Sequence, residues 1–301
     1  MTTITAKSIL ASRHAQTGDR LDTLLLRYPR CVHAELMTHR VFSRNAASSR
    51  AIPVDKMIQS VLDDPFVPLH WGRNQKGMQA TEETNAPVVL RAPPEEDSDG
   101  AFLFPTMEYT RKGAWLAARD EAVRFARAFS HAGYHKQIVN RLLEPFMHIT
   151  VLVSSTNWTN FLALRDHEDA EPHIRILAQR VREALDGAEV RVLEPGDWHL
   201  PFADTHDAVL PRDSLIKLSV ACCASTSYKT VDGFDMTLER AFEIFDKLAG
   251  SVPLHASPFE HVAQADVLEE FSGMLHWMLP KLHGNFVGFK QYRKMIPGEC
   301  Q

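Results

Sequence analysis

One short segment, residues 38 to 50, constrains this chain more than any other part of the sequence. It reads Thr-His-Arg-Val-Phe-Ser-Arg-Asn-Ala-Ala-Ser-Ser-Arg and places three guanidinium groups among serine hydroxyls and an amide. Guanidinium groups carry permanent charge in a rigid fork, and the neutral donors complete the hydrogen bonding of a phosphate. Because an apolar run precedes the segment and a proline follows it, we expect it to start near a strand end or a helix start. The pattern indicates a nucleotide site, and a solvated basic turn is the alternative.

The spacing within this first block resembles the signature of the flavin-dependent thymidylate synthases, Arg-His-Arg-x-x-Ser-x-Asn-x-x-Ser-x-Arg. Only the first arginine is replaced, by Thr38, and the matching positions are His39, Arg40, Ser43, Asn45, Ser48 and Arg50. The resemblance implies that the first part of the block contacts the flavin and that the last part grips the deoxyuridylate, largely at its phosphate. The implied flavin contacts are Thr38, His39, Arg40 and Asn45, and the implied nucleotide contacts are Ala46, Ala47, Ser48, Ser49 and Arg50.

Residues 154 to 175 resemble a second block of the same family, Asn-x-Arg-x-x-x-Asn-Phe-x-x-x-Arg followed by Ala-Gln-x-Glu-Ile. Asn160 and Arg165 fall on its central asparagine and arginine, whereas Ser154 and Thr156 replace its first asparagine and arginine. The resemblance implies that Asn160 contacts the flavin and that Arg165 presses against the pyrimidine. A guanidinium at a ring oxygen stabilises the electron-rich anion that C5 of a uracil needs in order to attack a methylene donor. We therefore expect Arg165 to be the central catalytic residue; a cation that balances a helix dipole is the alternative.

A third block, residues 255 to 261, reads His-Ala-Ser-Pro-Phe-Glu-His and resembles a family element that ordinarily precedes the arginine signature. Its place after the signature indicates a circular permutation, which domains tolerate when their termini lie close together at the surface. The resemblance implies that His255 lies near the folate or flavin ring and Ser257 near the flavin; an ordinary loop histidine is the alternative. Outside the blocks, Arg141 resembles a nucleotide-phosphate arginine of the family, and Glu35 stands where the family often has a nucleotide-contacting glutamine.

Interleaved helical and strand patterns predict an α+β fold, a mixed or antiparallel sheet flanked by helices, like that of the flavin-dependent thymidylate synthases but with a permuted order of elements. Apolar spacing predicts helices over 55–62, 113–132, 135–144 and 174–185 and a helix from residue 237. Another helix is predicted to run through residue 165, with residues 154–156 as its N-terminal cap. Strands are predicted over 148–153, 189–193 and 215–223. Residues 20–37 are expected to form a short helix or loop that leads into an apolar strand. We expect a single domain, 1–301, with a mobile insert at 65–105.

Composition excludes several classes of protein. At 301 residues, 45% of them hydrophobic, the chain can bury a substantial core. Its formal net charge of −5 argues against a nucleic-acid partner. No apolar stretch reaches the roughly 20 residues that cross a bilayer, and no secretory segment opens the sequence, so we expect a cytoplasmic protein with no membrane partner. The cysteines form no C-x-x-C pair, and Cys222 and Cys223 are expected in a strand, so no metal site is predicted.

The resemblance implies a flavoenzyme that uses FAD, NADPH and 5,10-methylenetetrahydrofolate to convert deoxyuridylate to thymidylate, with no nucleophilic cysteine. It also implies a homo-oligomer, a tetramer whose active sites are shared between subunits. Two alternatives stay open. Glu35 could favour a cytosine amino group, and capture of the methylene by water would give a hydroxymethylated deoxyuridylate or deoxycytidylate. The replaced positions, Thr38 and Thr156, would instead suit a non-catalytic nucleotide- or flavin-binding relic.

Overall fold

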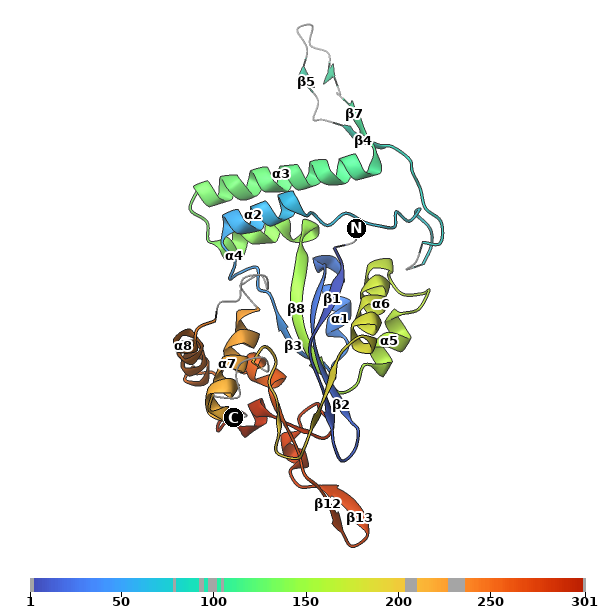
Figure 1. Cartoon of the computed structure of the whole chain (residues 1–301). Helices are drawn as coiled ribbons and strands as arrows, with labels where there is room; N and C mark the ends of the chain where they lie inside the picture. Colours follow the sequence, from blue (N-terminus) through green and yellow to red (C-terminus); the bar gives the residue numbers. More distant parts are fainter. Residues whose placement is uncertain are drawn as a thin grey trace. The chain divides into compact units, whose positions relative to one another are not determined.

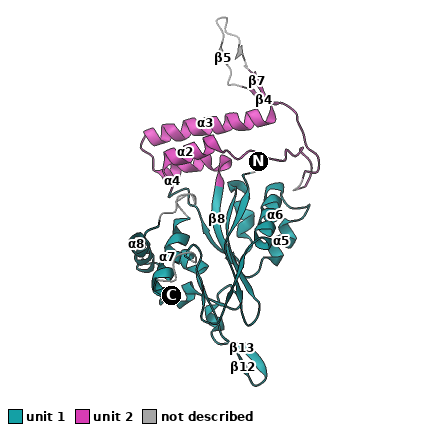
Figure 2. Cartoon of the chain, in the orientation of Figure 1, with its two compact units in different colours: residues 1–51, 149–301 teal, residues 52–148 magenta. Residues whose placement is uncertain are grey.

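The computed structural model describes residues 3–77, 80–91, 95–96, 102–103, 106–203, 210–226 and 236–299 (Figure 1). The chain divides into two compact units, which Figure 2 shows in separate colours. Unit 1 consists of Met1–Ala51 and Ile149–Gln301, and unit 2 consists of Ile52–His148. A division into compact units tests neither cooperative folding nor motion. The predictions of a single domain and of a mobile insert at 65–105 therefore stay predictions.

A five-stranded mixed sheet forms the centre of unit 1, in the order β3-β8-β2-β1-β9. Its strands are β1 (Thr5–His14), β2 (Arg20–Pro29), β3 (Ser43–Ala46), β8 (His148–Ser155) and β9 (Val190–Leu193). β1 is antiparallel to β2 and parallel to β9, and β3 is antiparallel to β8. β2 and β8 lie inside the sheet and are buried along most of their length, which suits their runs of leucine, isoleucine and valine.

Helices pack on both faces of this sheet (Figure 1). They are α1 (His33–Met37), which follows the 3-10 turn η1 (Arg30–Val32), α5 (Thr159–Arg165), α6 (Pro172–Asp186) and α7 (Arg212–Ser225). On one face α6 buries Ile174, Leu177, Ala178 and Val181, the spacing of an amphipathic helix, in a core shared with α1 and α5. On the other face α7 shares a buried cluster with β2 and β8. The predicted α+β architecture, a mixed sheet flanked by helices, is therefore confirmed.

The rest of unit 1 consists of short elements, of which α8 and η4 pack against α7. Its elements are β10 (Trp198–His199), α8 (Leu238–Ala249), η4 (Ser257–His261), β11 (Ala263–Ala265), β12 (Leu268–Phe271), β13 (Met274–Trp277), η5 (Pro280–Leu282), β14 (Phe289–Gln291) and α9 (Tyr292–Met295). β10, β11 and β14 form a small antiparallel sheet, and β12 and β13 form a hairpin. The Thr237 side chain caps α8 by accepting a hydrogen bond from the Arg240 amide, and α8 buries Ala241 and Phe245 in a core with α7.

Unit 2 is a small helical core with an extension of short strands. Its elements are α2 (Val54–Asp63), β4 (Val88–Arg91), β5 (Glu95–Glu96), β6 (Phe102–Leu103), β7 (Thr106–Tyr109), α3 (Arg111–His131), α4 (Lys136–Val139) and the 3-10 helix η2 (Asn140–Phe146). α2, α3 and η2 bury Met57, Val61, Val123 and Leu143 together. β4 pairs with β7 and β5 with β6, both antiparallel.

Most of the predicted elements are confirmed. The helices predicted over 55–62, 113–132 and 174–185 and from residue 237 are α2, α3, α6 and α8, and the strands over 148–153 and 189–193 are β8 and β9. The helix predicted over 135–144 is confirmed only in part. α4 ends at Val139, and a 3-10 helix continues through Pro145, whose ring has no amide hydrogen to donate.

Three local predictions are wrong. Residues 215–223 lie in α7 and not in a strand, because this helix is buried on nearly every side and its apolar residues show no helical period. Residues 20–37 form a strand first and a helix afterwards, the reverse of the predicted order. Ser154 and Ser155 belong to β8 and do not cap α5, which begins at Thr159 without a side-chain cap from its preceding residue.

None of the helices in the described ranges combines the length and the apolar character that a membrane crossing requires. Within the same ranges, no group of three or more histidine, cysteine, aspartate or glutamate side chains is arranged to hold a metal ion.

Candidate functional site

Strand β3 carries the centre of the first block and divides it between the two faces of the sheet. Successive side chains of a strand point to opposite faces. Asn45 faces α7, where its amide nitrogen donates to the backbone oxygen of Cys223 at 2.6 Å. Ala46 packs instead against the core on the α6 face. Arg44 donates to two backbone oxygens at the end of α1, at 3.0 and 3.4 Å. The side chains of the first block are therefore divided between two separate candidate sites.

The first site is the Arg165 cluster, which consists of Glu35, Thr38, His39 and Arg165. Arg165 is the last residue of α5, and the other three lie in α1 or directly after it. Arg165 Nη1 donates to Glu35 Oε2 at 2.8 Å, and Arg165 Nε donates to His39 Nε2 at 3.1 Å. A longer contact, 3.4 Å, joins Arg165 Nη2 to Thr38 Oγ1. Among the described residues these contacts use three of the five guanidinium N–H groups, so two stay available to a ligand.

His39 is held neutral in this cluster. Its Nε2 accepts from Arg165, so the ring proton is on Nδ1. The ring is buried against Phe42 and Phe161, with centroid distances of 5.8 and 5.1 Å. Burial lowers the pKa of His39, and the charges of Arg165 and Arg44 lower it further. A neutral imidazole orients the guanidinium without competing for its anionic partner.

Glu35 supplies the negative charge of the cluster. Burial raises the pKa of its carboxyl group; Arg165 opposes this rise and Glu171 adds to it. The side chain is 36% exposed, so water screens the ion pair with Arg165 and its contribution to stability is small. The pair therefore acts mainly to hold the guanidinium in place.

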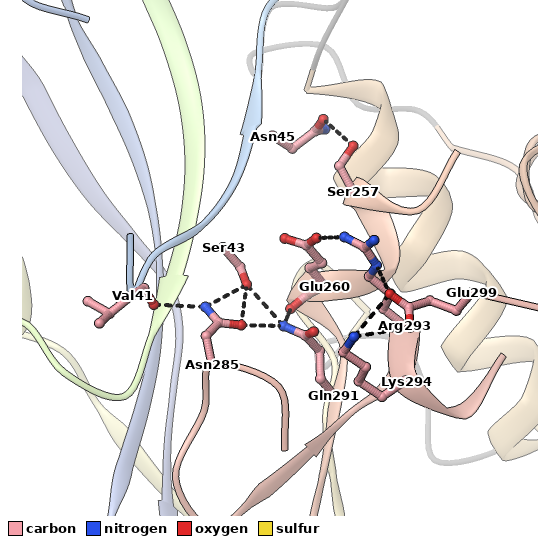
Figure 3. Close-up of polar contacts among 10 residues, drawn as sticks. All are labelled: Val41, Ser43, Asn45, Ser257, Glu260, Asn285, Gln291, Arg293, Lys294 and Glu299. Carbon is pink, nitrogen blue, oxygen red and sulfur yellow. Dashed lines mark hydrogen bonds and ion pairs between the residues drawn. The ribbon is translucent and has the colours of Figure 1, made fainter. Parts of the chain in front are cut away.

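The second site is a cavity of about 530 Å³, here called the α8 cavity. One wall is a face of α8 that includes Arg240, Ile244 and Lys247. The rest of the lining includes three of the predicted cofactor contacts, Asn45, His255 and Ser257. Ser257 Oγ donates to Asn45 Oδ1 at 3.5 Å (Figure 3), a contact between residues 212 positions apart in the sequence. The fold thus places the first and third blocks side by side.

A polar network that the sequence did not reveal joins these two blocks (Figure 3). Gln291 is 2% exposed, and its Nε2 lies 3.0 Å from Ser43 Oγ, 2.9 Å from Asn285 Oδ1 and 3.3 Å from the backbone oxygen of Glu260. Asn285 Nδ2 donates to the backbone oxygen of Val41 at 2.8 Å. The only signal in the sequence is a tail of amide, cationic and aromatic residues over 284–294, which does not say what the tail contacts.

Ion pairs extend this network to the C-terminal end of the described chain. Arg293 pairs with Glu260 of η4 and with Glu299, and Lys294 Nζ lies 3.0 Å from Glu299 Oε2. Figure 3 shows these side chains converging on η4 from α9 and the residues after it. The third block is thus held by β3 on one side and by the C-terminal segment on the other.

Substitution of Gln291 tests whether this network holds η4 in place. We expect Gln291→Leu to lower the free energy of unfolding by about 2 kcal/mol, because it removes the buried amide that donates to Ser43 Oγ, Asn285 Oδ1 and the backbone oxygen of Glu260. The matched control is Gln264→Leu on β11, which removes one hydrogen bond, to the backbone oxygen of Gly196 at 2.8 Å. Urea unfolding at neutral pH measures both variants. Equal losses in the two variants would contradict a special role for Gln291.

His261, the last residue of the third block, ends a buried chain of hydrogen bonds. The chain joins Ser12 Oγ to His199 Nδ1 (2.7 Å), His199 Nε2 to Thr23 Oγ1 (2.8 Å), Thr23 Oγ1 to Ser154 Oγ (2.6 Å) and Ser154 Oγ to His261 Nδ1 (2.9 Å). All five residues have no exposed surface. Burial lowers the pKa of each histidine to about 3, so both are neutral near pH 7. The chain fastens η4 to the central sheet.

The remaining predicted site residues lie outside the Arg165 cluster and are not among the described residues that line the α8 cavity. Arg40 and Arg50 are exposed, and neither forms an ion pair within the part of the chain that the structure describes. Asn160 is exposed on α5, and Arg141 is exposed in η2 of unit 2. The remaining predicted contacts in the first block are less exposed: Ala46 and Ala47 pack on the sheet core, and Ser48 and Ser49 are half-buried after β3. Their roles stay predictions.

Similarity to known proteins is found among solved structures. No protein-family model matches the sequence, and no curated protein matches it. Among solved structures, the UMP/dUMP methylase PolB from Streptomyces cacaoi, bound with 5-Br dUMP, is similar with 14% identity and a TM-score of 0.42, over 61% of this chain and 90% of that chain. The flavin-dependent thymidylate synthase ThyX from Helicobacter pylori, complexed with FAD and dUMP, is similar with 18% identity and a TM-score of 0.33, over 55% of this chain and 67% of that chain. Likeness at this level does not by itself assign an activity.

Proposed function

We propose that this protein is a flavin-dependent enzyme, related to the flavin-dependent thymidylate synthases, that transfers a one-carbon unit to C5 of a deoxypyrimidine monophosphate. The observation that carries the proposal is the contact of Asn45 with Ser257 at the α8 cavity. The first and third blocks resemble one family independently, and their predicted cofactor contacts meet in the folded chain. The permuted order of the blocks is part of the same proposal.

The lining of the α8 cavity supports FAD as the ligand. Its volume lies within the range of small-molecule sites. A flavin ring has an edge of alternating donors and acceptors, which Asn45, His255 and Ser257 can meet, and a flat apolar face, which suits Ile244 and Leu248. When bound, the flavin supplies the hydride that reduces the transferred carbon to a methyl group. NADPH as the reductant and methylenetetrahydrofolate as the carbon donor belong to the same proposal.

The Arg165 cluster is the proposed pyrimidine site. The two free N–H groups of Arg165 would bind a ring oxygen and stabilise the anionic pyrimidine, whose C5 is then nucleophilic enough to attack the methylene carbon. Glu35 and His39 hold the guanidinium in this orientation through bonds of 2.8 and 3.1 Å. The proton that C5 finally loses needs a base, and no described residue is assigned to that step.

A shared active site is the proposed reason for oligomerisation. The Arg165 cluster contacts the α6 face of the sheet, whereas the α8 cavity lies on the α7 face. One chain therefore presents its pyrimidine and flavin sites in different directions. We propose a homo-oligomer, a tetramer, in which the Arg165 cluster of one subunit completes the cavity of another.

A second candidate function differs in the base and in the product. Glu35 is bonded to Arg165, so a carboxylate lies within the proposed pyrimidine site. A carboxylate accepts from the amino group of cytosine but cannot donate to the carbonyl of uracil. Deoxycytidylate is therefore the alternative substrate, and hydroxymethylation, in which water replaces hydride, is the alternative outcome for either nucleotide.

One assay separates these functions. Purified protein is reconstituted with FAD, NADPH and methylenetetrahydrofolate, and deoxyuridylate or deoxycytidylate is added in separate reactions. We expect mass spectrometry to show a methyl group added to deoxyuridylate. A mass gain on deoxycytidylate alone, or a hydroxymethyl product, would replace the first candidate with the second. No bound flavin and no mass gain on either nucleotide would overturn the proposal of an enzyme and leave a binding relic.

A further inference from the structure

The α8 wall of the cavity carries charges that the proposed contacts with the flavin ring do not use. Arg240, Glu243, Ile244, Lys247 and Leu248 line the cavity from one helix face, because residues three, four and seven positions apart lie on the same side of a helix. Three of these five side chains are charged. The other described lining residues contribute no permanent charge, since they are Asn45, Ser257, His255 and the apolar Ala224 and Pro258.

The charges on this wall have a positive excess. Arg240 Nη1 forms an ion pair with Glu243 Oε2 at 2.9 Å, and the two side chains are 61% and 67% exposed. Lys247 lies one turn beyond Glu243 and forms no ion pair within the described ranges. Two cations therefore face the cavity against one carboxylate. An exposed pair such as Arg240–Glu243 is weak, so a ligand anion can displace the carboxylate.

We propose that Arg240 and Lys247 bind the phosphate or diphosphate group of the cavity's ligand, so that the site takes a phosphorylated flavin in preference to free riboflavin. The inference rests on the proposed flavin site and adds its anion contacts. The two residues are two helical turns apart, about 10 Å along the axis, and both have long flexible side chains that can converge on one anion. Charge-assisted bonds from both ends of the wall would hold the phosphate groups while the ring contacts the first and third blocks.

Binding of three flavins with different phosphate content tests this assignment. FAD, FMN and riboflavin are titrated into the full chain, and the quenching of flavin fluorescence is followed at low and at high salt. At low salt we expect FMN and FAD to bind at least about tenfold more tightly than riboflavin. The double variant Arg240→Gln, Lys247→Gln should reduce this preference to less than about threefold and leave riboflavin binding unchanged.

A substitution with the opposite sign sharpens the test. Glu243→Gln releases Arg240 and removes the one carboxylate among the described residues that line the cavity, so FMN and FAD should bind about threefold more tightly, with no change for riboflavin. The matched control is Glu183→Gln on α6. Arg180 pairs with Glu183 at 2.7 Å in the same i, i+3 arrangement, on the opposite face of the sheet.

Three results would overturn the assignment: equal affinity for riboflavin and FMN in the wild type, an unchanged preference in the double variant, or a gain in FMN affinity in Glu183→Gln equal to that in Glu243→Gln. Calorimetry with inorganic pyrophosphate separates this inference from the proposed function. Pyrophosphate binding that the double variant loses, without binding of any flavin, would keep the anion site and reject the flavoenzyme. Absence of both would reject both.

Discussion

Replacement of Arg165 by glutamine is expected to lower the turnover of deoxyuridylate about a thousandfold, which corresponds to about 4 kcal/mol of transition-state stabilisation. Glutamine keeps two N–H groups but has no charge, so it cannot stabilise the anionic pyrimidine. Arg165→Lys keeps the charge and loses the fork that binds Glu35 and His39 together, so it should recover only a small part of the activity. Turnover and the dissociation constant of deoxyuridylate measure the effect.

Two controls distinguish a catalytic Arg165 from a structural one. Arg182→Gln removes a neighbouring ion pair, with Asp166 at 2.8 Å, and should keep full turnover. The melting temperature of Arg165→Gln should stay within a few degrees of the wild type, because its ion pair with Glu35 is partly exposed. Full turnover in Arg165→Gln, or a loss of activity that follows a loss of folding, would remove Arg165 from the catalytic role.

Acidification is expected to destabilise the protein steeply, because His199 and His261 are buried in the neutral form. An unfolded histidine takes up a proton near pH 6.5, whereas these two do so only near pH 3. Between these values the unfolded state binds more protons, so stability falls as the pH falls, by up to about 1.4 kcal/mol per pH unit for each histidine. Their contribution is fully present above pH 6.5.

Another buried group opposes this trend over part of the range. Burial raises the pKa of Asp22 to about 6, so between pH 4 and pH 6 the folded state holds a proton that the unfolded state has lost. The net slope from the two histidines and Asp22 is therefore about 1.4 kcal/mol per pH unit between pH 6 and pH 4, and His33, whose pKa burial lowers to about 4, makes the total slope steeper. Urea unfolding at half-unit intervals of pH measures it.

A variant assigns the slope to the hydrogen-bond chain. His199→Asn removes one histidine that titrates and should lower the slope by about 1.4 kcal/mol per pH unit, although it also lowers stability at pH 7. The control is His167→Asn, which replaces a histidine that is 54% exposed and lies outside the hydrogen-bond chain. This substitution should leave the slope unchanged. A flat wild-type profile between pH 6 and pH 4 would show that the two buried histidines do not control acid stability.

Local sequence patterns were sufficient to predict the secondary structure where one face of a helix or one strand is buried. α6 repeats its apolar residues at helical spacing, and β8 is a β-branched run, so both were predicted correctly. α7 was not, because a helix that is buried on nearly all sides has no polar face to reveal its period. The contacts of Gln291 could not be predicted from local patterns either, because its partners lie as far away in the sequence as Ser43.

The candidate site was predictable as a set of residues but not as a geometry. The spacing of the three blocks identified Asn45, Arg165 and Ser257 without any coordinates. Which of them meet depends on the strand register and on the path of the chain between the blocks. β3 turns Asn45 toward α7 and η4, whereas the end of α1 turns His39 toward Arg165. Short motifs do not encode which residues of the first block lie near α7 and which lie near Arg165, because this depends on the face of the sheet to which each side chain points.

The sequence by itself determined the α+β class, the three blocks and the residue types that suit a flavin and a nucleotide, since all of these depend on local spacing and chemistry. Only the tertiary structure decided that residues of the first block lie on two faces of the sheet, that the third block lies against the first, and that Arg165 is held by Glu35. The physical reason is that these contacts join residues up to 212 positions apart, and their pairing is set by the packing of helices on the two faces of one sheet.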